Sequence, residues 1–136
     1  MIKINDLLKK DHVKLIFSIF QKNDAEIRLV GGCIRDLLIK KEIKDIDTAT
    51  ILKPNEILEL LKANNIEYDD FALQYGSIIA YPLNNKIQIT TLREDVNQIG
   101  RHTNVIYTTN WQKDASRRDF TINAIDFGIN NKIYDY

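Results

Sequence analysis

An adjacent pair of glycines, Gly31 and Gly32, separates a short apolar run from a stretch with a helical pattern. The apolar run over residues 27–30 predicts a strand, and residues 34–40 predict a helix. Glycines at such a junction allow a tight turn and let backbone amides come close to a ligand. Because unpaired amides and the helix dipole both favour negative charge, this segment predicts a strand–turn–helix unit with an anion site at its turn.

Two carboxylates, Asp45 and Asp47, follow the predicted helix. They occupy positions i and i+2 of residues 44–50, which read as a second strand, so they project from one face and can share metal ions. An Asp-x-Asp motif alone is a weak signal, because this spacing arises by chance in a chain with many aspartates. Its place just after the glycine pair makes the combination informative and suggests chemistry on a nucleoside triphosphate.

Three stretches have helical patterns. Residues 6–22 predict an amphipathic helix with Asn5 as its N-cap, and a second helix opens at Pro54 with its apolar side chains facing inward. Residues 114–118 predict a short helix. The helices alternate along the chain with predicted strands, which indicates a mixture of both kinds of element.

Two hairpins complete the pattern. Residues 75–81 and 86–92 flank Asn84–Asn85, and residues 124–127 and 132–134 flank a second pair of asparagines. The polar stretch over residues 96–113 predicts a long loop between them. Strands and helices in this order predict an α+β domain with one sheet.

Length and composition limit what the chain can be. With 136 residues and 44% hydrophobic content, it is one domain with a real core. The 19 basic and 19 acidic side chains balance, whereas a surface that holds nucleic acid through its phosphates is usually basic, so we do not expect it to hold a large RNA unaided. Cys33 is the one cysteine, so we expect a reducing, cytoplasmic setting, and nothing predicts a membrane partner.

Four segments, taken in order, resemble the catalytic head of the class II tRNA nucleotidyltransferases, the CCA-adding enzymes, and of the related bacterial poly(A) polymerases. They are residues 29–38 (LVGGCIRDLL), 45–50 (DIDTAT), 91–95 (TLRED) and 117–124 (RRDFTINA). The resemblance implies that residues 1–136 form a head domain with the nucleotidyltransferase fold of the polymerase β superfamily. That fold is a small mixed sheet backed by helices.

The resemblance also implies a metal centre. Asp45 and Asp47 match the residues that hold two Mg²⁺ ions, and Asp95 stands where a third catalytic carboxylate lies. Only one of Asp95 and its neighbour Glu94 can face the metals if both are on a strand. Two such ions activate the RNA 3′-hydroxyl and stabilise the leaving pyrophosphate in an in-line displacement, so no protein nucleophile is needed.

Nucleotide-binding residues are implied in the same way. The segment after the first predicted strand matches the part of the family that holds the triphosphate, and the last segment matches the part that positions the incoming nucleotide. The matching residues here are Gly31, Gly32, Arg35 and Asp36, and then Arg118, Asp119 and Asn123. The stretch 93–113 matches the family's flexible segment, which helps the enzyme switch from CTP to ATP. The implied partners are therefore CTP, ATP and the tRNA 3′ end.

The resemblance stops at the head. The family's base-reading motif and its neck, body and tail domains, which hold tRNA, belong after residue 136. We therefore expect either a head cut from a longer protein or a split gene whose second polypeptide supplies the rest. Without the base-reading residues, the sequence does not separate CCA addition from C-only, A-only or poly(A) synthesis.

Simpler interpretations remain open. The chain could be a non-catalytic subunit or remnant that retains the fold, and its aspartates could be solvated charges at a strand end. Arg35 and Asp36 could be a surface ion pair, and Trp111 could pack the loop or stack on a base, of which packing is favoured. An aspartyl phosphatase also uses Asp-x-Asp, but Ala49 stands where that family has Thr or Val.

Overall fold

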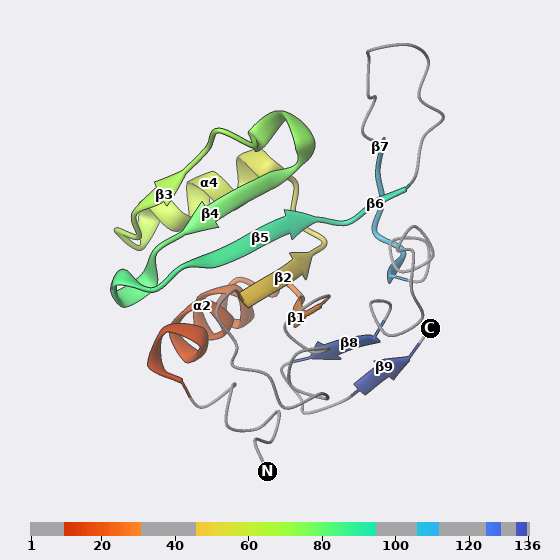
Figure 1. Cartoon of the computed structure of the whole chain (residues 1–136), viewed down its shortest axis with the longest axis horizontal. Coiled ribbons are helices and arrows are strands. Elements are labelled where there is room, and N and C mark those ends of the chain that lie inside the picture. The colour runs from red at the N-terminus through yellow and green to blue at the C-terminus, as the bar shows by residue number, and fades with distance from the viewer. Residues whose placement is uncertain (1–9, 31–45, 95–105, 112–124, 129–132, 136) are drawn as a thin grey trace.

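The structure is a computed structural model, which describes residues 10–30, 46–94, 106–111, 125–128 and 133–135 (Figure 1). Its main feature is a mixed sheet whose strands lie in the order β3-β4-β5-β2-β1-β8-β9. The pair β2·β5 is parallel and every other neighbouring pair is antiparallel. The strands are β1 (Ile27–Leu29), β2 (Ile46–Thr50), β3 (Tyr68–Asp69), β4 (Ser77–Ala80), β5 (Ile87–Thr91), β8 (Ile125–Gly128) and β9 (Ile133–Asp135).

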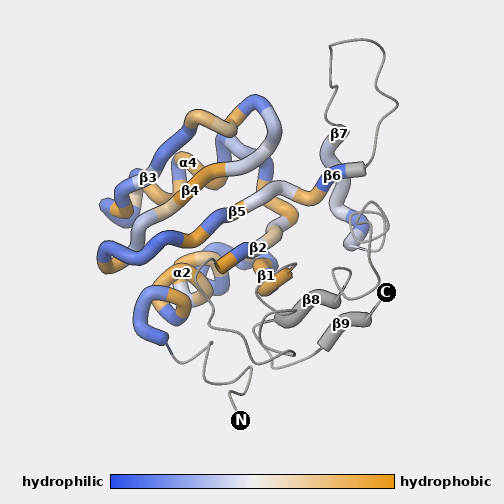
Figure 2. The backbone as a smooth tube through the Cα atoms, viewed as in Figure 1, coloured by the Kyte–Doolittle hydropathy of each residue, from blue (hydrophilic) through white to orange (hydrophobic). Residues whose placement is uncertain are grey.

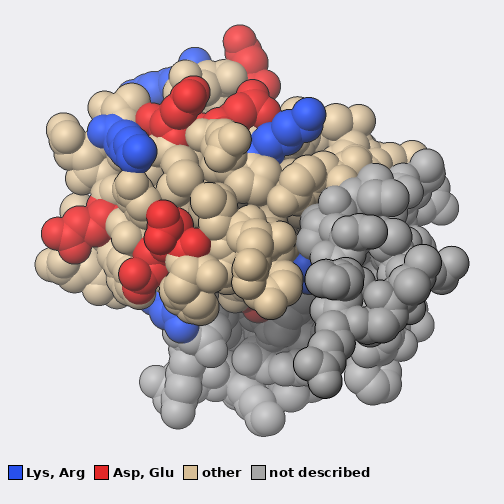
Figure 3. All heavy atoms as spheres, turned by 90° about the horizontal axis from the view of Figure 1, so that it is seen from above, with Lys and Arg blue, Asp and Glu red and all other residues tan. Residues whose placement is uncertain are grey.

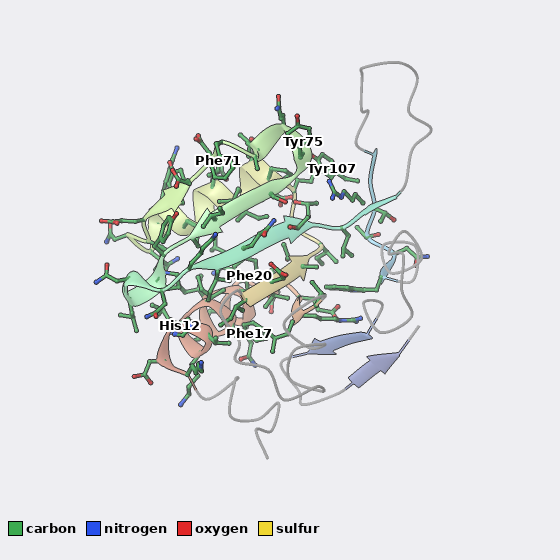
Figure 4. All side chains as sticks on the ribbon, viewed as in Figure 1. His12, Phe17, Phe20, Phe71, Tyr75 and Tyr107 are labelled. Atoms are coloured by element: carbon green, nitrogen blue, oxygen red, sulfur yellow. The ribbon has the colours of Figure 1, made fainter. Side chains whose placement is uncertain are left out.

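Two helices, α2 (Asp11–Lys22) and α4 (Pro54–Ala63), cover one face of this sheet. Phe17 and Phe20 of α2 and Ile57 and Leu61 of α4 pack in one core with the apolar side chains of the central strands (Figure 4). Figure 2 shows hydrophobic and hydrophilic residues alternating around α2, as expected of a helix with one buried face. Within the described residues, no helix is long and apolar enough to span a bilayer.

The start of α2 corrects the expected helix over residues 6–22. Lys10 has φ −62° and ψ 135°, which is extended backbone, so the helix begins at Asp11. Asn5, the expected N-cap, lies outside the described residues. The helix expected at Pro54 is confirmed: proline occupies its first turn, and the backbone amide of Lys53 donates to Oε1 of Glu56 at 3.1 Å.

Both predicted hairpins are confirmed. β4 and β5 pair antiparallel across a short 3₁₀ turn, η2 (Pro82–Asn84), and β8 pairs with β9. The first strand begins at Ser77 rather than at residue 75, because Leu73–Tyr75 form a 3₁₀ turn (η1) and Gly76 follows with φ +82°. That left-handed backbone ends the turn and redirects the chain into β4.

A two-stranded ribbon corrects part of the loop expected over residues 96–113. Arg93–Glu94 (β6) pair with Ile106–Tyr107 (β7), and Figure 1 shows the ribbon standing off the end of β5. At its base the amide of Thr108 donates to the carbonyl of Leu92 at 3.0 Å. Tyr107 lies against Gly76, with Tyr75 nearby (Figure 4). The helices expected over residues 34–40 and 114–118 lie outside the described residues.

Candidate functional site

Strand β2 carries the described part of the site. Its side chains alternate as predicted: Ile46 and Thr48 are buried on the helix-covered face, whereas Asp47 is half-buried and faces the other way. We call this opposite side, which carries Arg28, Val30, Asp47 and Ala49, the second face of the sheet. The alternation places a carboxylate on the face that α2 and α4 leave open.

The backbone at Asp47 links this carboxylate to the predicted anion site. The amide of Val30 donates to the carbonyl of Asp47 at 3.0 Å, which extends the antiparallel pairing of β1 and β2 by one residue. Val30 immediately precedes Gly31 in the sequence. The end of β1, from which the chain enters the glycine pair, therefore lies directly beside Asp47.

Most of the predicted site falls outside the described residues, so Asp47 is the only one of those side chains that the structure places. The undescribed members are Gly31, Gly32, Arg35, Asp36, Asp45, Asp95, Arg118, Asp119 and Asn123. Glu94, the alternative to Asp95, belongs to β6 and pairs with Ile106 of the ribbon rather than with β2. The assignments of these residues stay predictions.

Asp47 suits a divalent cation. Carboxylate oxygens are the ligands that Mg²⁺ prefers, and this carboxylate is half-buried on the second face. Among the described residues no three His, Cys, Asp or Glu side chains gather into a metal site. Within that part of the chain, Asp47 therefore supplies one oxygen-donor side chain and does not form a closed cage.

A small apolar cluster on the second face was only partly anticipated. Trp111 is buried together with Val30, Ala49 and Leu92, so its packing interpretation is confirmed. The guanidinium of Arg28 lies 3.8 Å from the centre of the Trp111 ring, and its Nε donates to Oε1 of Glu26 at 2.8 Å. Sequence reasoning missed Arg28 because it read the whole run 27–30 as apolar, although period-two alternation puts residue 28 on the face opposite Ile27 and Leu29.

A second residue that sequence reasoning missed is Gln88. It pairs with Asp47 in the parallel register of β2 and β5, and like Asp47 it is half-buried. The alternation of Ile87 and Ile89 with Gln88 was visible in the sequence. What the sequence did not show was which residue of β5 stands level with Asp47, because that depends on a pairing between distant strands.

Comparison with known proteins identifies a family whose members are similar to this chain. A family model described as "Poly A polymerase head domain" matches residues 27–136. The chain is 42% identical to the mitochondrial CCA tRNA nucleotidyltransferase 1 of Danio rerio over 119 residues, which are 87% of this chain and 28% of that protein. It is 37% identical to the CCA-adding enzyme of Oceanobacillus iheyensis, covering 83% of this chain and 28% of that protein.

Solved structures agree with these relatives. A CCA-adding enzyme of Bacillus stearothermophilus in complex with CTP superposes with a TM-score of 0.77 at 26% identity, over 91% of this chain and 29% of that one. A tRNA nucleotidyltransferase complexed with a primer tRNA and an incoming ATP analogue superposes with a TM-score of 0.68 at 25% identity, over 89% and 34%. The expected α+β nucleotidyltransferase fold is confirmed, and the chain spans under a third of the curated relatives it matches.

Proposed function

The chain belongs to the family of poly A polymerase head domains, and from that membership we propose that it is the catalytic head of a template-independent RNA nucleotidyltransferase. The reaction is transfer of nucleotides from CTP and ATP to the 3′ end of tRNA, with release of pyrophosphate. The observation that carries the proposal is the position of Asp47: a half-buried carboxylate on β2, hydrogen-bonded through its backbone to the residue that precedes the glycine pair.

The relatives support the substrate class. Curated relatives that are 33–42% identical to this chain are called CCA tRNA nucleotidyltransferases or CCA-adding enzymes, and solved neighbours are complexed with CTP, an ATP analogue or tRNA. We extend these substrates to this chain because the family model matches residues 27–136, the range that contains all four of the segments named above, and because the fold is the same.

In this proposal Asp45 and Asp47 hold the Mg²⁺ ions, with Asp95 as a further carboxylate. When bound, the ions supply charge neutralisation at the triphosphate and lower the pKa of the attacking hydroxyl. The amides of Gly31 and Gly32 bind phosphate oxygens. The triphosphate and the ribose are oriented by the remaining polar side chains, namely Arg35, Asp36, Arg118, Asp119 and Asn123.

We also propose that tRNA is held by another part of the protein, either a continuation of this chain or a second polypeptide. The head alone has no net charge, and on the face drawn in Figure 3 acidic and basic side chains of the described residues are interspersed. Binding to tRNA phosphates calls for a concentration of positive charge. The neck, body and tail that the family places after its head are the candidates.

An incorporation assay tests the proposal. A tRNA that lacks its terminal CCA is incubated with labelled CTP or ATP and Mg²⁺, with the chain alone and together with the product of the reading frame downstream. We expect incorporation that Asp47→Asn abolishes, because the amide cannot supply a charged ligand. Asp70→Asn is the matched control, since Asp70 is an exposed carboxylate in the turn before η1.

Two other outcomes of this assay would contradict the proposal in different ways. Incorporation that survives in Asp47→Asn would remove that residue from its role. If no incorporation occurs even with the downstream product present, the chain is better described as a non-catalytic subunit that retains the fold.

A further inference from the structure

Gln88 stands beside Asp47 on the second face of the sheet. The two residues are register partners in the parallel pair β2·β5, and paired strands lie about 4.8 Å apart. Ile87 and Ile89 on either side of Gln88 are fully buried against the helices, whereas Gln88 is half-buried. The side chains of Asp47 and Gln88 therefore leave neighbouring strands at the same level and on the same face.

The amide of Gln88 is oriented by its neighbours on β4. Its Nε2 points to Oγ of Ser77 at a long hydrogen-bond distance of 3.5 Å, and that hydroxyl is 2.9 Å from Oγ1 of Thr90. β5 lies between β4 and β2. With the NH₂ arm held on the β4 side, the carbonyl oxygen Oε1 is the arm available on the β2 side, where Asp47 lies.

From this placement we infer that Gln88 is a further residue of the site, which offers a neutral amide oxygen to the divalent cation held by Asp47. The inference rests on the proposed function, since it assumes that a cation binds at Asp47. Side-chain amide oxygens are ordinary ligands of hard cations. They carry no net charge, so a site with glutamine at this level binds a cation less tightly than one with a carboxylate there.

This neutral ligand has a consequence for the order of binding. At a site with fewer negative side chains, the triphosphate supplies part of the negative charge that balances the divalent cation. The cation then binds this chain weakly alone and more tightly together with the nucleotide. A substitution that adds a charge at residue 88 strengthens binding of the cation alone and makes that binding less dependent on nucleotide.

The alternative is that Gln88 is only a polar side chain on the surface of the sheet and does not bind the cation. In that case, removing the amide with Gln88→Leu leaves binding of the cation unchanged, although a charge placed at residue 88 still acts on a nearby cation. Gln21 provides the matched position: it is an exposed glutamine in α2, and α2 packs on the opposite face of the sheet. The pair Gln88→Glu and Gln21→Glu therefore separates a local effect from a change of net charge.

The experiment titrates the 136-residue chain with Mn²⁺ alone and follows the free ion by its electron paramagnetic resonance signal. We expect Gln88→Glu to tighten the dissociation constant by about tenfold or more, because the added charge adjoins the cation. We expect Gln21→Glu to leave the constant within about twofold of the unmodified chain, because a distant surface charge is screened. Gln88→Leu, which removes the oxygen, should weaken binding by about tenfold. Circular dichroism verifies that each variant is folded.

The Asp47→Asn substitution, alone and combined with Gln88→Glu, separates this inference from the proposed function. Weaker binding in Gln88→Leu, together with tighter binding in Gln88→Glu that Asp47→Asn removes, supports the inference. Where the unmodified chain alone binds Mn²⁺ too weakly to measure, it is compared with Gln88→Leu in the presence of CTP. If the chain binds Mn²⁺ through Asp47 but Gln88→Leu binds as tightly as the unmodified chain, or Gln88→Glu behaves like Gln21→Glu, the inference is overturned and the proposed function stands. Binding that Asp47→Asn leaves unchanged, or no binding in any variant, overturns both.

Discussion

Substitution of Gly76 by alanine should destabilise the protein through two separable effects. Gly76 has φ +82°, where an L-residue costs about 1–2 kcal/mol. A Cβ built there would also lie 2.9 Å from Cε1 of Tyr107, and relieving such an overlap in a packed region costs about 1–3 kcal/mol. We expect Gly76→Ala to lower the free energy of unfolding by about 2–5 kcal/mol in total.

Urea denaturation followed by circular dichroism measures this change, and a double-mutant cycle separates its parts. In a Tyr107→Ala background the overlap is gone, so the cost of Gly76→Ala should fall to the backbone part of about 1–2 kcal/mol. Asn65→Ala is the matched control, because Asn65 also has positive φ (55°) but lies in the turn after α4, away from Tyr107. A cost for Gly76→Ala below about 0.5 kcal/mol, or an equal cost in both backgrounds, would refute the reasoning.

Two further predictions concern stability. Arg28→Met removes the cation that stacks on Trp111, so the free energy of unfolding should fall by about 1–2 kcal/mol and the fluorescence of this single tryptophan should shift; an unchanged spectrum and stability would contradict the role of the stack. Burial, and then the charge of Lys10, lower the pKa of His12 below its usual value, so the unfolded chain takes up the proton more readily and stability is lost as the pH falls below about 6.5. Unfolding of His12→Gln measured between about pH 8 and pH 5 should show a shallower loss than the unmodified chain, and parallel curves would show that His12 contributes nothing.

Local sequence signals correctly predicted the features that depend only on residues close together in the chain. Proline at the start of α4, period-two alternation in β2 and the asparagines between β4 and β5 each act within a few residues, and each was confirmed. The predicted start of α2 was wrong because the apolar residues 7 and 8 were joined to those farther along the chain across the polar residues 9–12, and the backbone of Lys10 within that stretch is extended. Hydrophobic spacing records which residues can share a face and does not record where the backbone leaves the helix.

Such local signals do not predict which distant strands pair with one another. β7 has only two residues, Ile106–Tyr107, and exists because it pairs with β6, so nothing in its own sequence distinguishes it from a loop. Asp47 was predicted as a site residue from a motif, and the structure places it where the alternation of β2 required. Gln88 belongs to no motif, and only the register of β2 with β5 draws attention to it.

The register that places Asp47 next to Gln88 is fixed from the helix-covered face. Thr48 is 1% exposed, and its hydroxyl donates to the carbonyl of Gln88 at 2.9 Å, which satisfies a group that would be costly to bury without a partner. A slip of β2 by one residue would turn Thr48 outward and drive the carboxylate of Asp47 into the core between α2 and α4. Burying that charge without a partner costs far more than the slip could regain in apolar contacts. The alternation that builds the core therefore also holds the two polar side chains level on the second face, so the same few residues of β2 determine both stability and the site.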